Sequence, residues 1–186
     1  MTQLDSLTHV RELLKNHKTA DDGEAVSLRR IQELIATAAS PFSRQNYIPG
    51  HLTASAVVAD PTRQFTALIF HGKLKRWLQP GGHFEPGEHD PSLAAAREVS
   101  EETGLETRWP GAAALLLDVD VHEIPARKSE PAHFHFDLRM LLIAEKGVLR
   151  VGEGTTDARW FDARECAALN LDPGIYRALK KIGFQL

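Results

Sequence analysis

The chain has 186 residues, of which 42% are hydrophobic and 25% charged, proportions that are typical of one globular domain with a real core. A net charge of −3 excludes a strongly basic protein that binds nucleic acids through its overall charge. The single cysteine, Cys166, excludes an internal disulfide and any cysteine-cluster metal site.

No signal peptide or membrane span is predicted. The first 18 residues lack the apolar core of a signal peptide, and the longest strongly apolar run, residues 112–117, is too short to cross a bilayer. We therefore expect a cytoplasmic protein that does not act at a membrane.

Residues 1–40 are predicted to form two helices, the second capped at its start by residues 21–24 and ended by Pro41. Apolar residues recur there at helical spacing: Leu7, Val10, Leu14, Ile31, Leu34, Ile35 and Ala38. Up to residue 45 there are six basic and six acidic residues, which argues against a DNA-binding helix pair. We expect a helical extension over residues 1–45, packed either on a main domain of residues 46–186 or on a partner in a homodimer.

The main domain alternates strands with helices. Strand-like runs at residues 51–59 and 65–71 are joined by a turn, and a third short extended segment ends at Gly81 and Gly82. Further strands are predicted at residues 114–123, 132–143 and 158–161. Two C-terminal helices are indicated by Asp162 with Glu165, and by Asp172 followed by Pro173. This order predicts an α+β domain with helices packed against a mixed sheet.

A helix is predicted between these strands, over residues 91–103. Asp90 is a suitable N-cap, Pro91 a suitable first residue, and Gly104 a suitable left-handed C-terminal stop. Its helical periodicity places Glu98, Glu101 and Glu102 on one face. We expect Ala94 and Ala95 on that same face, and the opposite face toward the core: Leu93, Ala96, Val99 and Thr103.

Three carboxylates on one helix face are suited to a hard cation such as Mg²⁺ or Mn²⁺, which prefers oxygen ligands. The alternative is a solvated acidic face, the usual fate of a run of charge. The segment just before the helix, GGHFEPGE (residues 81–88), is rich in turn residues and can bring backbone close to the same ions or to phosphates.

With this loop included, the sequence resembles the Nudix hydrolase family. Its signature is glycine, five residues, glutamate, seven residues, then Arg-Glu-apolar-x-Glu-Glu-x-Gly-apolar, and residues 97–105 (REVSEETGL) match every defined position. Gly82 and Glu88 have the five-residue gap, but eight residues rather than seven separate Glu88 from Arg97. We expect the extra residue to be absorbed in the loop before the helix.

The resemblance implies a sheet packed between helices in an α/β/α sandwich. It also implies water attack at phosphorus in the pyrophosphate linkage of a small nucleotide, with Mg²⁺ or Mn²⁺ as cofactor. By resemblance, Glu98, Glu101 and Glu102 hold the metals together with the Gly81 carbonyl, and Arg97 orients a helix glutamate. Gly82, Glu88 and Gly104 are structural. The general base is Glu98 or Glu153, unless Glu153 is only an exposed loop acid.

Other polar residues are candidates for substrate contact. Lys73, Arg76 and His83 flank the loop and could meet phosphates, although each taken alone is better explained as a surface residue. Two runs, residues 117–122 and 133–139, alternate apolar with polar side chains, and a hairpin would bring their polar faces together. That face carries His122, His133 and His135, which predicts substrate or additional metal contact, with a solvated sheet face as the alternative.

Two other classes of function compete with hydrolysis. A Nudix-fold diphosphate isomerase of the cysteine-dependent kind is disfavoured, because Cys166 lies far along the chain from the glutamates. A ligand-sensing module without catalysis is disfavoured because the carboxylates of the signature are all present.

Overall fold

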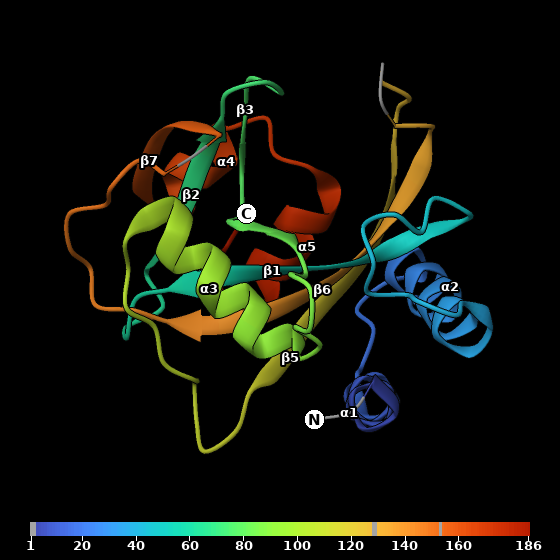
Figure 1. The fold of residues 1–186 in the computed structure, drawn as a ribbon. Helices are drawn as coiled ribbons and strands as arrows, with labels where there is room; N and C mark the ends of the chain where they lie inside the picture. The colour runs from blue at the N-terminus through green and yellow to red at the C-terminus, as the bar shows by residue number, and fades with distance from the viewer. Residues whose placement is uncertain (1–2, 128–129, 153) are drawn as a thin grey trace.

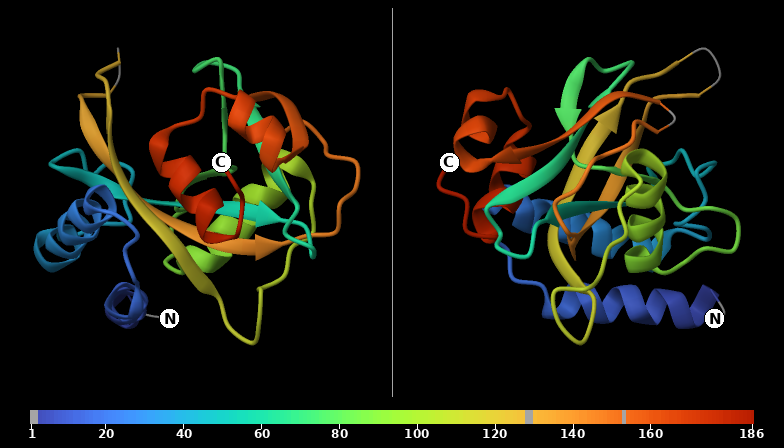
Figure 2. Two further views of the ribbon diagram at one scale, coloured as in Figure 1. Left: turned by 180° about the vertical axis from the view of Figure 1, so that it is seen from behind. Right: turned by 90° about the vertical axis from the view of Figure 1, so that its left-hand side faces the viewer.

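The computed structural model describes residues 3–127, 130–152 and 154–186, and it shows one mixed sheet with helices on both faces (Figures 1 and 2). The helices are α1 (Gln3–Asn16), α2 (Asp22–Thr37), α3 (Pro91–Thr103), α4 (Ala163–Ala168) and α5 (Pro173–Lys181). The strands are β1 (Gly50–Ala59), β2 (Phe65–His71), β3 (Arg76–Leu78), β4 (Gly81–His83), β5 (Leu115–Ile124), β6 (His133–Ile143) and β7 (Thr155–Asp162). The predicted α+β class is confirmed.

The sheet is organised around β1, which is buried along its whole length. Its main path runs β3-β2-β1-β6-β5, with β4 paired to β1 and β7 paired to β2. The pair β1 and β6 is parallel and joins residues that lie far apart in the chain, so that His51 stands beside His135 and Thr53 beside Asp137. The predicted hairpin of β5 and β6 is present and sets His122 opposite His135.

One face of the sheet is covered by α1, α2 and α3, which share a single hydrophobic cluster with it. Val10 and Leu14 from α1 and Ile31 and Leu34 from α2 belong to this cluster together with Leu52 of β1. The N-terminal helices are therefore present as predicted and pack on the sheet. A domain boundary near residue 45 stays a prediction.

The other face is covered by α4 and α5, with a second hydrophobic cluster beneath them. Asp162 and Glu165 form the predicted capping box at the start of α4, and Cys166 is buried there. In the part of the chain that the structure describes, no helix combines the length and the apolarity that a membrane span requires.

A buried ionic group links the N-terminal and C-terminal helices. Glu24 of α2 has no exposed surface and accepts hydrogen bonds from Lys181 of α5 and from the Ala20 N–H, at 2.6 Å for the latter. His17 Nε2 lies 2.7 Å from the same carboxylate. Burial alone would raise the pKa of Glu24, but these partners lower it to about 2.

Helix α3 has the predicted ends. The Asp90 side chain accepts hydrogen bonds from the backbone N–H groups of Ser92 and Leu93, and Gly104 follows the helix in the left-handed conformation, with φ at 70°.

The predicted orientation of α3 was partly wrong. Val99 and Thr103 are buried as expected, but Leu93 is 58% exposed, whereas Ala94 and Ala95 are fully buried. The part of the helix that carries Glu98 and Glu102 therefore turns toward the sheet, because the small side chains of Ala94 and Ala95 allow close packing, whereas Glu101 stays exposed.

Candidate active site

Two glycines of β4 lie against α3 and β1 at this site. A Cβ atom on Gly82 would lie 2.5 Å from a carboxylate oxygen of Glu98, and one on Gly81 would lie 2.3 Å from the Ser55 Cβ. The Gly81 N–H donates a hydrogen bond to Glu102 Oε2 at 3.0 Å. A side chain at Gly82 would therefore displace the Glu98 carboxylate, which the sequence predicts to be functional, and one at Gly81 would push β4 away from β1.

Arg97 of α3 forms ion pairs with three glutamates of this site. It donates two hydrogen bonds to Glu88, at 3.1 and 2.8 Å, and one each to Glu98 at 2.9 Å and Glu101 at 3.0 Å. It also donates to the backbone oxygen of His83 at 2.9 Å. The predicted pairing of Arg97 with a helix glutamate is thus present, and Glu88 reaches Arg97 despite the eight-residue separation.

The carboxylates carry more negative charge than their surroundings neutralise. Burial raises the pKa of Glu102 to about 7, and the charges of Glu98 and Glu101 add to the effect. Burial also raises the pKa of Glu98, in spite of its bond to Arg97. A divalent cation at this face would relieve that cost, so the residues present fit the Mg²⁺ or Mn²⁺ that the resemblance implies.

The three glutamates do not already form a closed ligand set. Among the described residues, the group of His, Cys, Asp or Glu side chains with ligand atoms within 4.8 Å of one another consists of histidines instead. Arg97 draws Glu98 and the exposed Glu101 toward itself, while Glu102 bonds to the backbone of Gly81.

Other predicted residues lie elsewhere. Lys73 is exposed in the turn between β2 and β3, and Arg76 forms an ion pair with Asp172 at the start of α5. Glu153 lies outside the described residues. Among the described residues before it, Gly152 donates its N–H to the backbone oxygen of Glu102 at 3.1 Å, so residues 150–152 lie beside the end of α3.

The polar face of β5 and β6 is mostly buried, so the alternative of a solvated face is wrong for most of it; only its outer end, at His122, is exposed. Asp118, Asp137 and Arg139 are all at least 97% buried. Asp118 accepts a hydrogen bond from Arg139 at 2.8 Å, and Asp137 accepts one from Ser55 at 2.6 Å. Arg139 pairs with both aspartates, which avoids the cost of a buried charge without a partner.

The same face brings together histidines from three strands. The rings of His133 and His135 lie within 5.0 Å of the ring of His51, between centroids, and His83 lies 5.1 Å from His51. His122 is further out, with its ring 5.6 Å from that of His135. His51 was missed by the sequence analysis. Its alternation with Thr53 and Ser55 marks a polar face, but the pairing of β1 with β6 is not visible in the sequence.

A groove of about 390 Å³ adjoins the loop between β4 and α3. It is lined by residues 84–89, including Glu88, and by the segment of residues 40–45 that precedes β1. A larger pocket of about 750 Å³ lies against α5, away from the glutamates. We regard the smaller groove as the better candidate for a substrate, because it shares Glu88 with the ion-pair group of Arg97.

The fold and the site together define a mixed α+β domain in which the carboxylates of one helix, α3, lie against the two glycines of strand β4. The NUDIX domain family matches residues 49–182. That range covers most of the chain and includes the whole of this site. The chain belongs to the Nudix family.

Solved structures agree on the fold. A Nudix-family hydrolase from Clostridium perfringens has a TM-score of 0.55 at 21% identity, with 75% of this chain and 97% of that one covered. An Ap4A hydrolase from C. elegans gives 0.54 at 16%, covering 70% and 93%. The Nudix domain of Shewanella oneidensis NrtR, solved with ADP-ribose, gives 0.52 at 14%, covering 81% and 94%. These likenesses show the sheet-and-helix fold, including its Nudix type.

Proposed function

We propose that this protein is a divalent-metal-dependent hydrolase that cleaves the pyrophosphate linkage of a nucleoside diphosphate derivative or a nucleoside triphosphate. The observation that carries the proposal is the position of Glu98 and Glu102, which lie against Gly82 and Gly81 with raised pKa values. The small nucleotides that are named with the neighbouring structures, Ap4A and ADP-ribose, belong to this substrate class.

Each residue of the site has a distinct proposed role. Glu98, Glu101 and Glu102 supply carboxylate oxygens, and the carbonyl of Gly81 supplies a further oxygen. When bound, Mg²⁺ or Mn²⁺ would neutralise the pyrophosphate and lower the pKa of the attacking water. Arg97 holds Glu98 in place and is itself fixed by two hydrogen bonds to Glu88. The general base is Glu98 or Glu153, and of these two only Glu98 lies among the residues that the structure describes.

The isomerase alternative lacks its nucleophile in this fold. Cys166 is a fully buried residue of α4, and burial raises the pKa of its thiol to about 12. A thiol in that environment is a structural residue of the core and not a reactive one.

The experiment that tests the proposal is a hydrolysis assay with a panel of nucleotides. The panel contains ADP-ribose, diadenosine polyphosphates and nucleoside triphosphates, each with Mg²⁺ or Mn²⁺ and with a chelator as control. We expect metal-dependent release of nucleotide products, with ¹⁸O from labelled water in a phosphate group. Binding without turnover would favour the ligand-sensing alternative, and conversion of isopentenyl diphosphate without hydrolysis would favour the isomerase.

We expect Gly82→Ala to reduce kcat/KM on the best panel substrate by about 10–100-fold, because misplacing a reacting group by roughly 1 Å can cost about 10² in rate. The added Cβ would meet the Glu98 carboxylate, which is the end of a flexible side chain and can move aside, so the fold should be retained. The control is Gly111→Ala, since a Cβ there meets nothing within 4 Å. Equal activity in the two variants would contradict the role of Glu98.

A further inference from the structure

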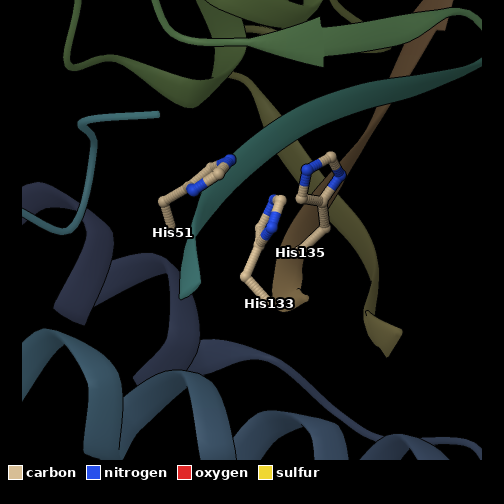
Figure 3. A group of neighbouring side chains, drawn as sticks. All are labelled: His51, His133 and His135. Atoms are coloured by element: carbon tan, nitrogen blue, oxygen red, sulfur yellow. The ribbon is translucent and has the colours of Figure 1, made fainter. Parts of the chain in front are cut away.

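Three imidazole rings converge on the sheet face opposite α3. His51 comes from β1, and His133 and His135 come from β6 (Figure 3). Each ring offers one nitrogen, and these three nitrogens lie within 4.8 Å of one another. His51 and His133 are at least 95% buried. Such a group is uncommon in a protein interior, where polar side chains normally have hydrogen-bond partners.

The Nδ1 atoms of two rings lie at hydrogen-bonding distance from backbone oxygens. His51 Nδ1 lies 3.2 Å from the oxygen of Asn46, and His133 Nδ1 lies 2.8 Å from that of Pro131. A carbonyl only accepts hydrogen bonds, so each Nδ1 carries the proton and each Nε2 is left with a free lone pair. Metal-binding histidines have this same arrangement, with the second nitrogen donating to a carbonyl.

The other ring nitrogen of His51, Nε2, has no such partner among the described residues. His51 Nε2 is buried and makes no hydrogen bond to any of the described residues. Leaving a buried polar atom unsatisfied typically costs about 1–3 kcal/mol, so a ligand that accepts this lone pair would stabilise the fold.

The hydrogen bonds of the rings decide between two kinds of ligand. His51 and His133 each use Nδ1 toward a backbone oxygen, so that Nε2 is the nitrogen available to a ligand. A nitrogen lone pair binds a cation, whereas an anion such as phosphate would require N–H donors at that position. Burial lowers the pKa of His51 and of His135, which also disfavours charged rings at these two positions.

We propose that His51, His133 and His135 form a binding site for a divalent transition-metal cation of the Zn²⁺ type. Imidazole nitrogen suits Zn²⁺, Co²⁺ or Ni²⁺ and not Mg²⁺ or Ca²⁺, which require oxygen ligands. Three histidines leave the fourth position of a tetrahedral site open. His83 lies next to the three histidines, with its ring 4.9 Å from that of His135.

This histidine site is separate from the glutamates of α3. Successive residues of a strand face opposite sides of the sheet, so His51 faces away from Leu52, which belongs to the cluster beneath α3. The site therefore does not depend on the proposed hydrolase function. It joins the first residues of β1 to the first residues of β6.

The test uses the purified full chain, stripped of metal by a chelator and titrated with Co²⁺ in the presence of excess Mg²⁺. We expect one equivalent of Co²⁺ to bind with the visible absorption bands of a tetrahedral nitrogen-ligated ion. His51→Gln and His133→Gln should each weaken Co²⁺ binding by at least about tenfold, the lower end of what is lost even when a residue supporting a ligand is removed. The matched control is His71→Gln on β2, which should bind like the wild type.

Two further measurements keep the outcome decisive. Glu102→Gln should bind Co²⁺ as the wild type does, whereas loss of the bands in that variant would assign the cation to the glutamates and overturn the proposal. X-ray absorption on the Zn²⁺-loaded wild type needs no variant and should show at least three imidazole nitrogens at about 2.0 Å. Absence of tetrahedral bands in the wild type, or a shell of oxygen ligands alone, would also overturn it.

Discussion

Glu102→Gln is expected to reduce kcat/KM by about 10³-fold, in line with the loss of one strong electrostatic contact to the reacting groups. Glutamine has nearly the same shape and still accepts the hydrogen bond from Gly81, so the fold should be kept. Its neutral amide is a poor ligand for Mg²⁺ or Mn²⁺.

The same substitution should raise stability when it is measured without metal. Burial raises the pKa of Glu102 to about 7 from an ordinary value of 4.5, so the folded state binds this proton more tightly than the unfolded state. The stabilisation of the folded state by the protonated carboxyl of Glu102 is complete below about pH 4.5, and it is lost as the pH rises through about 7. The Tm of Glu102→Gln should therefore equal that of the wild type at pH 4.5 and exceed it at pH 8.

Steady-state kinetics on the best panel substrate and calorimetry with a chelator present measure the two effects. The control is Glu106→Gln, an exposed glutamate just past α3, which should leave both quantities unchanged. Activity within threefold of the wild type would contradict the catalytic role of Glu102. A lower Tm at pH 8 would contradict the raised pKa of its carboxyl group.

Glu24→Ala is expected to destabilise the fold by about 3–5 kcal/mol, the usual cost of removing one partner of a buried ion pair. The substitution removes Glu24, one of the two acidic partners of Lys181. The other partner, Asp118, remains, with its Oδ2 3.0 Å from Lys181 Nζ. It also removes the acceptor of the Ala20 N–H. Both losses loosen the contact between α2 and α5.

The pH dependence of this contribution has the opposite sign to that of Glu102. The partners of Glu24 lower its pKa to about 2 from an ordinary 4.5, so the stabilisation is complete above about pH 4.5 and is lost as the pH falls toward 2. Urea unfolding at pH 7 and pH 3 measures it, and the difference between wild type and variant should shrink at the lower pH. The control is Glu33→Ala, exposed on the same helix. A constant difference at both pH values would contradict the assignment.

The sequence predicts helix α3 well because its ends depend on local chemistry. Asp90, Pro91 and Gly104 act on the backbone within a turn of themselves, and the helix begins and ends where they place it. The spacing of Glu98 and Glu102 likewise follows from helical geometry. The Nudix resemblance rests on such local spacing, and the family match confirms it.

The orientation of that helix could not be read from its own residues. Leu93 is apolar and was expected in the core, yet it is exposed, while Glu98 and Glu102 turn toward the sheet. Periodicity tells which side chains share a face but not which face is covered. The covering depends on Gly82 of β4, because a Cβ atom there would lie 2.5 Å from a carboxylate oxygen of Glu98.

The sequence by itself therefore determined most elements of this protein, the two ends of α3 and the carboxylates of its signature, all of which depend on contacts a few residues apart. The tertiary structure alone decided that His51 meets His133 and His135. Their strands pair in parallel across more than 80 residues of chain, and in a fixed register. Alternation assigns each histidine to a polar face, but only the pairing of buried strands brings those faces together.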